Sequence, residues 1–267
     1  MNVGTTLPQF RNEAEAALET ARAAEQAGLA GVFVFDHLWP LGQPERPALH
    51  SKALLGALAV ETTRVMLGTL VARVGLLPDA VLVHGMQTLR RMTGDRFDAG
   101  LGTGDAGNRD ENLAYGVPNA SKDERLARLA ACCDRLRDAG VLTWAGGRSL
   151  ELRLVAARHA GGWNTWQTDP VTFAADAAGV RALAGERAFE TTWGGQVLVG
   201  RTRAHAAEKL ERHGTRPGLV HGTVDDLVAH LEALAEGGAS WAICAPLDVG
   251  VDPEALELLG QAAERVR

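Results

Sequence analysis

Residues 24–40, AEQAGLAGVFVFDHLWP, hold the repeating unit on which the fold depends. The residues before Gly28 complete a helical pattern over residues 13–27, in which alanines recur every three or four positions. Glycine is the residue type that commonly follows the last turn of a helix. The apolar run 31–35 then has the length of a buried strand, and it ends directly on an Asp-His pair. A helix, a glycine, a short apolar strand and a polar strand end together indicate an α/β protein.

The same alternation continues through the whole chain. Eight short apolar runs are expected to be strands, at residues 3–7, 31–35, 65–71, 97–102, 141–144, 162–166, 196–199 and 241–245. The longer amphipathic stretches are expected to be helices, at residues 13–27, 49–61, 79–92, 122–137, 149–159, 170–183, 203–213, 224–236 and 253–266. Each unit takes about 33 residues, and no linker interrupts the pattern, which predicts one (β/α)8 TIM barrel domain over residues 1–267. A doubly wound open sheet is the alternative, because local patterns do not show whether a sheet closes.

Composition excludes several classes of protein. The chain is 46% hydrophobic and 22% charged with a formal net charge of −6, which argues against partnership with nucleic acid or an anionic membrane. Cys132, Cys133 and Cys244 form no CxxC pair, and no HxH or HExxH spacing occurs, so neither a disulfide framework nor a metal site is expected. No stretch approaches about 18 uninterrupted apolar residues, and the first residues lack a secretory pattern. We therefore expect a cytoplasmic protein without a membrane span.

In a barrel of this kind the functional side chains lie at the carboxyl ends of the strands. Asp36 and His37 directly follow the strand at 31–35, and an acid beside an imidazole is suited to handling a proton. A capping Asp with a loop His is an equally open interpretation. Within the run 65–71, Gly68 and Thr69 indicate a bulge or the close approach of a ligand, but packing within the protein is the favoured interpretation.

Two glycine-rich segments follow later strands. Residues 96–108 read RFDAGLGTGDAGN, and alternate glycines there would let a flat ligand or its phosphate lie against backbone. No GxGxxG pattern follows the first strand, which argues against a Rossmann domain. Gly146, Gly147 and Arg148 lead directly into a helix, so exposed amides and a positive charge predict an anion site there, with a simple helix cap as the alternative.

Taken together, these segments resemble the bacterial luciferase-like oxidoreductases, in particular the branch that uses the deazaflavin coenzyme F420. The segments that carry the resemblance are residues 24–38, 67–71, 93–108, 112–118, 148–166 and 220–227. Its most specific part is an Asp-His pair after the second strand combined with a glycine-rich acidic segment after the fourth. The resemblance implies coenzyme F420 as the cofactor, with FMN as the alternative, a small-molecule substrate and a homodimer.

The resemblance also implies roles for individual residues. His37 and Asp105 would be catalytic, and Asp105 stands where the family's dehydrogenases have a glutamate that acts on protons. Leu70 and Val71 would form a bulge with a non-prolyl cis peptide bond behind the deazaflavin ring. The residues expected to bind the cofactor are Asp36, Thr69, Leu70, Val71, Thr103, Gly104, Asn108, Gly146, Gly147 and Arg148, the last three around its phosphate.

Two departures from the family limit what can be carried over. The connection before the strand at 141–144 is short, where relatives usually carry a long insertion. We therefore expect an open mouth at the carboxyl end of the barrel and do not infer the substrate from the family. Trp39 lies closer to the Asp-His pair than in the sugar-phosphate dehydrogenases, and no lysine is expected near a strand end, which disfavours a sugar phosphate. The sequence therefore predicts an oxidoreductase that moves a hydride between a deazaflavin and a small organic substrate. An FMN-dependent monooxygenase and a non-catalytic flavin-binding protein are the alternatives.

Overall fold

The computed structural model describes residues 1–104 and 106–267, and the strands in this part of the chain form one parallel sheet. Their bounds are β1 (Asn2–Thr6), β2 (Gly31–Val34), β3 (Met66–Thr69), β4 (Ala72–Arg73), β5 (Phe97–Gly102), β6 (Thr143–Gly146), β7 (Gly162–Trp166), β8 (Glu190–Gly200), β9 (Val220–Thr223) and β10 (Trp241–Pro246). The sheet closes because β10 pairs in parallel with both β8 and β1. Closure excludes the open sheet and confirms the (β/α)8 barrel, whose eight main strands are those expected.

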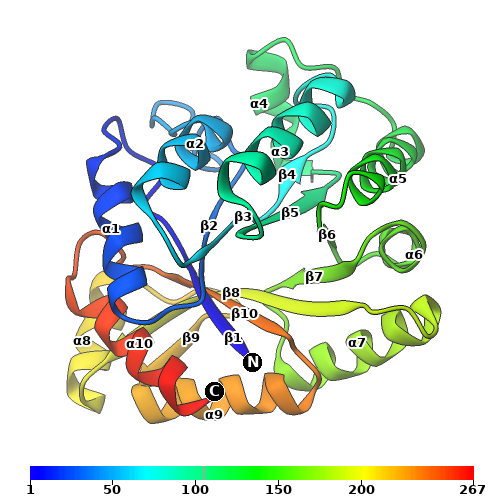
Figure 1. The fold of residues 1–267 in the computed structure, drawn as a ribbon. Coiled ribbons are helices and arrows are strands. Elements are labelled where there is room, and N and C mark those ends of the chain that lie inside the picture. Colours follow the sequence, from blue (N-terminus) through cyan, green and yellow to red (C-terminus); the bar gives the residue numbers. More distant parts are fainter. Residues whose placement is uncertain (105) are drawn as a thin grey trace.

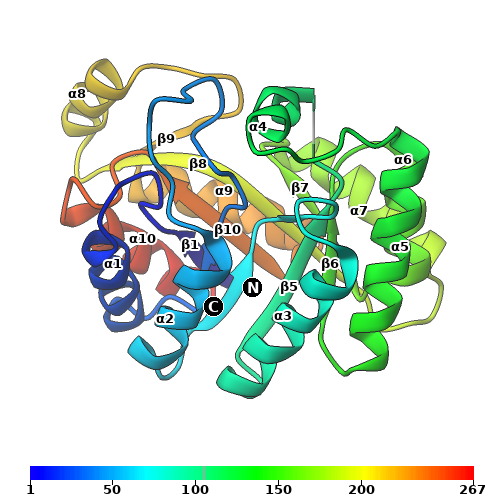
Figure 2. The same cartoon turned by 90° about the horizontal axis from the view of Figure 1, so that it is seen from above.

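Helices surround this barrel on all sides (Figure 1). Their bounds are α1 (Glu15–Gln26), α2 (Ser51–Glu61), α3 (Asp79–Thr93), α4 (Arg109–Ala114), α5 (Lys122–Asp138), α6 (Leu150–His159), α7 (Pro170–Ala184), α8 (Arg203–His213), α9 (Val224–Glu236) and α10 (Glu254–Arg265), with a 3-10 turn, η1, at Ala106–Asn108. The chain termini lie close together at one end of the barrel, and α4 lies at the other (Figure 2). Residues 139–142 alone connect α5 to β6, as the sequence indicates. Within the described residues, every helix is too short or too polar to cross a membrane.

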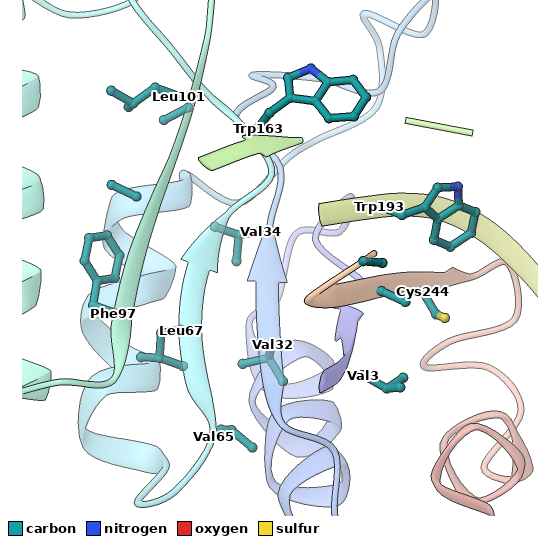
Figure 3. Packing of buried hydrophobic residues seen from close by; sticks show 14 of the residues in the cluster. Val3, Val32, Val34, Val65, Leu67, Phe97, Leu101, Trp163, Trp193 and Cys244 are labelled. Atoms are coloured by element: carbon teal, nitrogen blue, oxygen red, sulfur yellow. The ribbon is translucent and has the colours of Figure 1, made fainter. Parts of the chain in front are cut away.

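The outer face of the barrel packs against the helices. Alternate residues of each strand point outward, and on β5 these are Phe97, Ala99 and Leu101. Figure 3 shows members of this cluster side by side on neighbouring strands. Burying each side chain of this size stabilises the fold by about 1.5–3 kcal/mol, so this layer supplies much of the hydrophobic free energy.

The inside of the barrel is filled by aromatic rings. The Phe33 ring centroid lies 5.8 Å from that of Trp144 and 5.5 Å from that of Trp241. A Cβ placed on Gly68 would lie 2.6 Å from Cε1 of Phe33. Gly68 therefore makes room for this ring, which agrees with the packing interpretation of that glycine and not with the close approach of a ligand.

Two carboxylates face the interior near the amino-terminal ends of their strands. Asp98 alternates with the outward-facing Phe97 and Ala99, and Glu190 accepts a 2.9 Å hydrogen bond from Nε1 of the interior Trp144. Burial, reinforced by the neighbouring Glu190 carboxylate, raises the pKa of Asp98 to about 7. Burial also raises the pKa of Glu190, and the Trp144 hydrogen bond offsets this only in part.

This arrangement predicts that Asp98→Asn stabilises the protein at alkaline pH. Because the pKa of Asp98 is higher in the folded state, folding becomes less favourable as pH rises from about 4 to about 7 and stays so above that. The full difference is worth at most about 4 kcal/mol, and with relaxation of the surroundings we expect about 2 kcal/mol. Urea denaturation at pH 4.5 and pH 8 measures it. The gain should be fully present at pH 8 and clearly smaller at pH 4.5, whereas Asp138→Asn at the exposed end of α5 should change little at either pH. Equal gains at both pH values would contradict the assignment.

Candidate active site

Asp36 lies just beyond the end of β2, and its side chain is buried. Its carboxylate accepts hydrogen bonds from Ser51 Oγ at 2.5 Å, from Lys52 Nζ at 2.6 and 2.7 Å, and from the Arg73 amide at 2.9 Å. Burial alone would raise the pKa of Asp36, but the Lys52 charge and these hydrogen bonds outweigh it and hold the pKa below its usual value. The carboxylate thus joins the end of β2 to the first turn of α2 and to β4.

Lys52 corrects one expectation from the sequence. No lysine was expected near a strand end, yet its ammonium contacts the residue that follows β2, and its side chain is only 14% exposed. The contact arises because α2 packs beside β2 and places its first turn at the carboxyl end of the barrel. The order of elements in a barrel implies this placement of the helix, but the sequence pattern does not show that a side chain of its first turn reaches back to Asp36.

His37 lies against a buried glutamate that the sequence interpretation missed. Its Nδ1 atom is 3.5 Å from Oε2 of Glu111 and 3.3 Å from Nδ2 of Asn108, and its side chain is 20% exposed. Glu111 belongs to α4, is fully buried, and also accepts the backbone N–H of Leu38. The pairing places a carboxylate behind the imidazole and leaves the ring's other nitrogen for a bound molecule.

The charges around Glu111 keep it ionised. Burial alone would raise its pKa, but the contact with His37, the Leu38 amide and the charge of Arg73 outweigh it and lower the pKa. Nη1 of Arg73 lies 3.0 Å from Oε2 of Glu111. A carboxylate that holds one nitrogen of an imidazole fixes its tautomer and ring orientation, which suits proton transfer at the other nitrogen.

The segment after β3 has the bulge that was expected. The peptide bond between Leu70 and Val71 is cis. Leu70 packs in the interior cluster with Phe33 and Trp144, while Thr69 Oγ1 donates a 2.6 Å hydrogen bond to the carbonyl oxygen of Gly100. These residues form the floor of the barrel mouth.

The glycines at this floor serve a different purpose from the one predicted. A Cβ on Gly102 would lie 2.5 Å from Cγ2 of Val71, and one on Gly146 would lie 2.8 Å from Cγ1 of the same side chain. A Cβ on Gly100 would overlap the carbonyl oxygen of Thr69. The alternate glycines therefore accommodate the 69–71 bulge, and the bulge occupies the space that we expected a ligand to use.

The loop after β6 leads into α6 as the sequence indicates. Ser149 caps the helix by accepting the Leu152 N–H at 3.3 Å, so the helix-cap interpretation is correct for this residue. The Gly147 N–H donates to the Asn164 carbonyl at 3.0 Å, and Arg148 is exposed. An anion here would meet the amides of the first turn of α6 and Arg148, while the Gly147 amide is already used within the sheet.

The predicted site residues fall into three groups. Asp36, His37 and Asn108 meet through Glu111 and Arg73. The second group forms the floor of the barrel mouth and consists of Thr69, Leu70, Val71 and Gly146. The loop after β6 continues from it with Gly147 and Arg148. Thr103, Gly104 and Asn108 line a cavity of about 330 Å³ beside the mouth. Asp105 lies outside the described residues, so its predicted catalytic role is carried forward from the sequence alone.

The sequence interpretation missed Glu111, Arg73 and Ser51. A glutamate within the polar run Arg109–Ala114 has the pattern of an exposed helix, and only its neighbours in space make it functional. Arg73 had a detectable signal, because it is a charge within the apolar segment that follows the third strand. Among the described residues, no group of three or more His, Cys, Asp or Glu is placed to hold a metal ion.

Known proteins resemble this chain in sequence over about half of its length. It is 32% identical over 131 residues to the F420-dependent glucose-6-phosphate dehydrogenase of Nakamurella multipartita, covering 49% of this chain and 37% of that protein. It is 34% identical over 126 residues to the enzyme of the same name from Beutenbergia cavernae, covering 47% of this chain and 35% of that protein. The alignments thus span little more than a third of the length of these curated relatives.

Solved structures resemble it over the whole barrel. An F420-dependent secondary alcohol dehydrogenase, solved with an F420-acetone adduct, superposes with a TM-score of 0.83 at 16% identity and covers 100% of this chain and 99% of its own. The F420-dependent tetrahydromethanopterin reductase from Methanopyrus kandleri superposes with a TM-score of 0.77 at 14% identity, covering 97% of each chain. At these identities the likeness shows the fold. The family model described as luciferase-like monooxygenase matches residues 1–241. The chain therefore belongs to the luciferase-like monooxygenase family.

Proposed function

We propose that this protein is an oxidoreductase that binds the deazaflavin coenzyme F420 and moves a hydride between it and a small organic substrate. The observation that carries this assignment is the His37 imidazole, held at the end of β2 by the buried Glu111 carboxylate. The names of the curated relatives and of the alcohol dehydrogenase, all F420-dependent, favour the deazaflavin over FMN.

The residues at the mouth fit such a cofactor. The floor formed by Leu70 and Val71 is apolar and rests on the packed Phe33 and Trp144, so a planar ring would find a firm surface there. The amino-terminal turn of α6, with Arg148 exposed beside it, offers amides and a positive charge for a phosphate. When bound, the deazaflavin supplies the hydride chemistry.

The chain's own residues handle the proton. Glu111 holds Nδ1 of His37, so the other ring nitrogen gives a proton to the substrate oxygen or takes one from it. Asp36 does not reach the substrate in this scheme, because Ser51, Lys52 and Arg73 occupy its carboxylate; it is a positioning residue that fixes the end of β2. Thr69, Thr103, Gly104 and Asn108 remain proposed cofactor contacts.

A parallel titration with F420 and FMN tests this function. We expect saturable F420 binding at least about tenfold tighter than FMN binding, followed by reduction of bound F420 when a panel of small alcohols is added. Absorbance and fluorescence report both steps. Preference for FMN with consumption of dioxygen would instead establish a monooxygenase. Tight F420 binding without transfer to or from any member of the panel would favour the non-catalytic binding protein.

A further inference from the structure

The cavity beside the barrel mouth is strongly basic. It lies between the ends of β4 and β5, α4 and the start of α5. The charged and amide side chains that line it are Arg73, Arg109, Arg125, Arg128, Asn108, Asn112 and Asn119. Among the described residues that line it, none is an aspartate or a glutamate.

The residues that the structure describes neutralise only part of this positive charge. Arg128 forms a paired contact with Asp79, at 2.9 Å from Nη2 to Oδ1. Arg73 reaches Glu111 through Nη1 alone. Arg125 donates from Nη1 to the carbonyl oxygens of Thr103 and Gly104, at 2.9 and 3.3 Å, and these satisfy a donor without cancelling a charge. The described surroundings of the cavity therefore keep an excess of positive charge.

Two of these guanidinium groups also have unused donors. Nη2 of Arg73 and Nε of Arg125 are buried and make no hydrogen bond within the described part of the protein. The Arg73 side chain is only 7% exposed, so water does not readily replace the missing acceptor. Buried donors are normally paired, and leaving them unpaired destabilises a fold unless a ligand supplies the acceptor.

We propose that this cavity binds an oxyanion, a carboxylate or phosphate group carried by a ligand. The planar fork of a guanidinium matches two oxygens of either group, and a buried charge-assisted pair is strong. A change of side-chain rotamer at the rim, which is common on binding, would bring the donors within reach of the ligand. Arg73 also donates from Nε to the Asp36 carbonyl oxygen at 2.9 Å, so the oxyanion would lie next to the residues that hold His37.

Binding of inorganic phosphate to the cofactor-free protein tests the cavity alone. Calorimetry at constant ionic strength, balanced with KCl, should show saturable binding by the wild type. Arg125→Gln removes one of the charges, and Asn112→Asp places a competing carboxylate 3.1 Å from Nη1 of Arg73 with almost no change in size. Both variants should bind phosphate at least about tenfold more weakly. Arg135→Gln, on the exposed face of α5, is the matched control and should bind like the wild type.

Asn112→Asp keeps the acceptor that Arg73 already uses, so it is expected to fold even if Arg125→Gln disturbs the 103–104 backbone. Equal phosphate affinity in the wild type and Asn112→Asp would overturn the proposal, as would a wild type that binds no phosphate.

Addition of F420 distinguishes the two sources of the oxyanion, and this step alone rests on the proposed function. Competition between phosphate and F420 in the wild type, lost in Asn112→Asp, would assign the cavity to the phosphate of the cofactor. Unchanged phosphate binding to F420-loaded protein would assign it to an acidic substrate. Both outcomes support the oxyanion site. Phosphate binding at the cavity with no F420 binding at all would refute the proposed function and leave the site intact.

Discussion

Replacing His37 with glutamine should slow hydride transfer by about two orders of magnitude or more, with little change in F420 affinity. Glutamine retains a hydrogen-bonding group beside Asn108 but cannot exchange a proton with the substrate. Because the pKa of Glu111 is lowered, the carboxylate behind the imidazole stays charged across the neutral range and does not itself titrate there. The loss of rate should therefore persist across the neutral range. Single-turnover absorbance measurements between pH 5 and 9 follow both effects.

The control for this substitution is His84→Gln, which changes an exposed histidine on α3 and should turn over normally. Asp105→Asn provides the competing test. If His37→Gln turns over like the wild type while Asp105→Asn is inactive, the proton role belongs to Asp105. If the wild type binds F420 but transfers no hydride, and both variants behave in the same way, the non-catalytic interpretation is correct.

Replacing Lys209 with methionine should destabilise the fold by about 3–5 kcal/mol. The Lys209 side chain is 1% exposed, and Nζ lies 2.7 Å from both Asp248 and Asp252 and 2.9 Å from the Val199 carbonyl oxygen. Burial alone would lower the pKa of this lysine, but the two carboxylates outweigh it and raise the pKa. Methionine fills the space and leaves the buried Asp248 charge without a partner. Urea denaturation at pH 7 measures the loss.

Lys122→Met is the matched control, because its pair with Glu151 is about half exposed on both sides and should contribute less than about 1 kcal/mol. The pKa of Asp252 is lowered in the folded state: burial opposes this, but the Lys209 contacts outweigh it. A carboxylate with a lowered pKa stabilises the fold above its unfolded pKa, and that contribution disappears as pH falls. The difference in the free energy of unfolding between the wild type and Lys209→Met should therefore become smaller as the pH falls. Similar losses of stability for Lys209→Met and Lys122→Met would show that the buried Lys209 cluster does not stabilise the fold more than an exposed ion pair.

The barrel could be predicted from the sequence because its outer layer is regular. Most strands contribute alternate apolar residues to the cluster under the helices, and most helices have a matching apolar stripe. β8 shows where the pattern fails: it runs over Glu190–Gly200, whereas only residues 196–199 were expected. Its first half points Thr192 and Gly194 into the barrel, and polar or small residues of that kind have the composition of a loop.

The site could be predicted only in part, for a related physical reason. His37 was identifiable because it directly follows an apolar strand, so its position along the chain fixes its position at the mouth. Glu111 acts through contacts with Leu38 and Arg73, each more than 30 residues away in sequence. A carboxylate whose role depends on such distant partners has no local signature, and a single sequence contains nothing else to reveal it.

The fit between Val71 and the glycines across from it has a consequence for variation in this barrel. Gly102 and Gly146 lie on different strands, yet neither can gain a Cβ unless methyl groups are removed from Val71. Substitutions at the three positions are therefore coupled, and a change at one is tolerated only with a compensating change at another. Anyone reshaping the mouth for a new substrate would therefore have to change these positions together rather than one at a time.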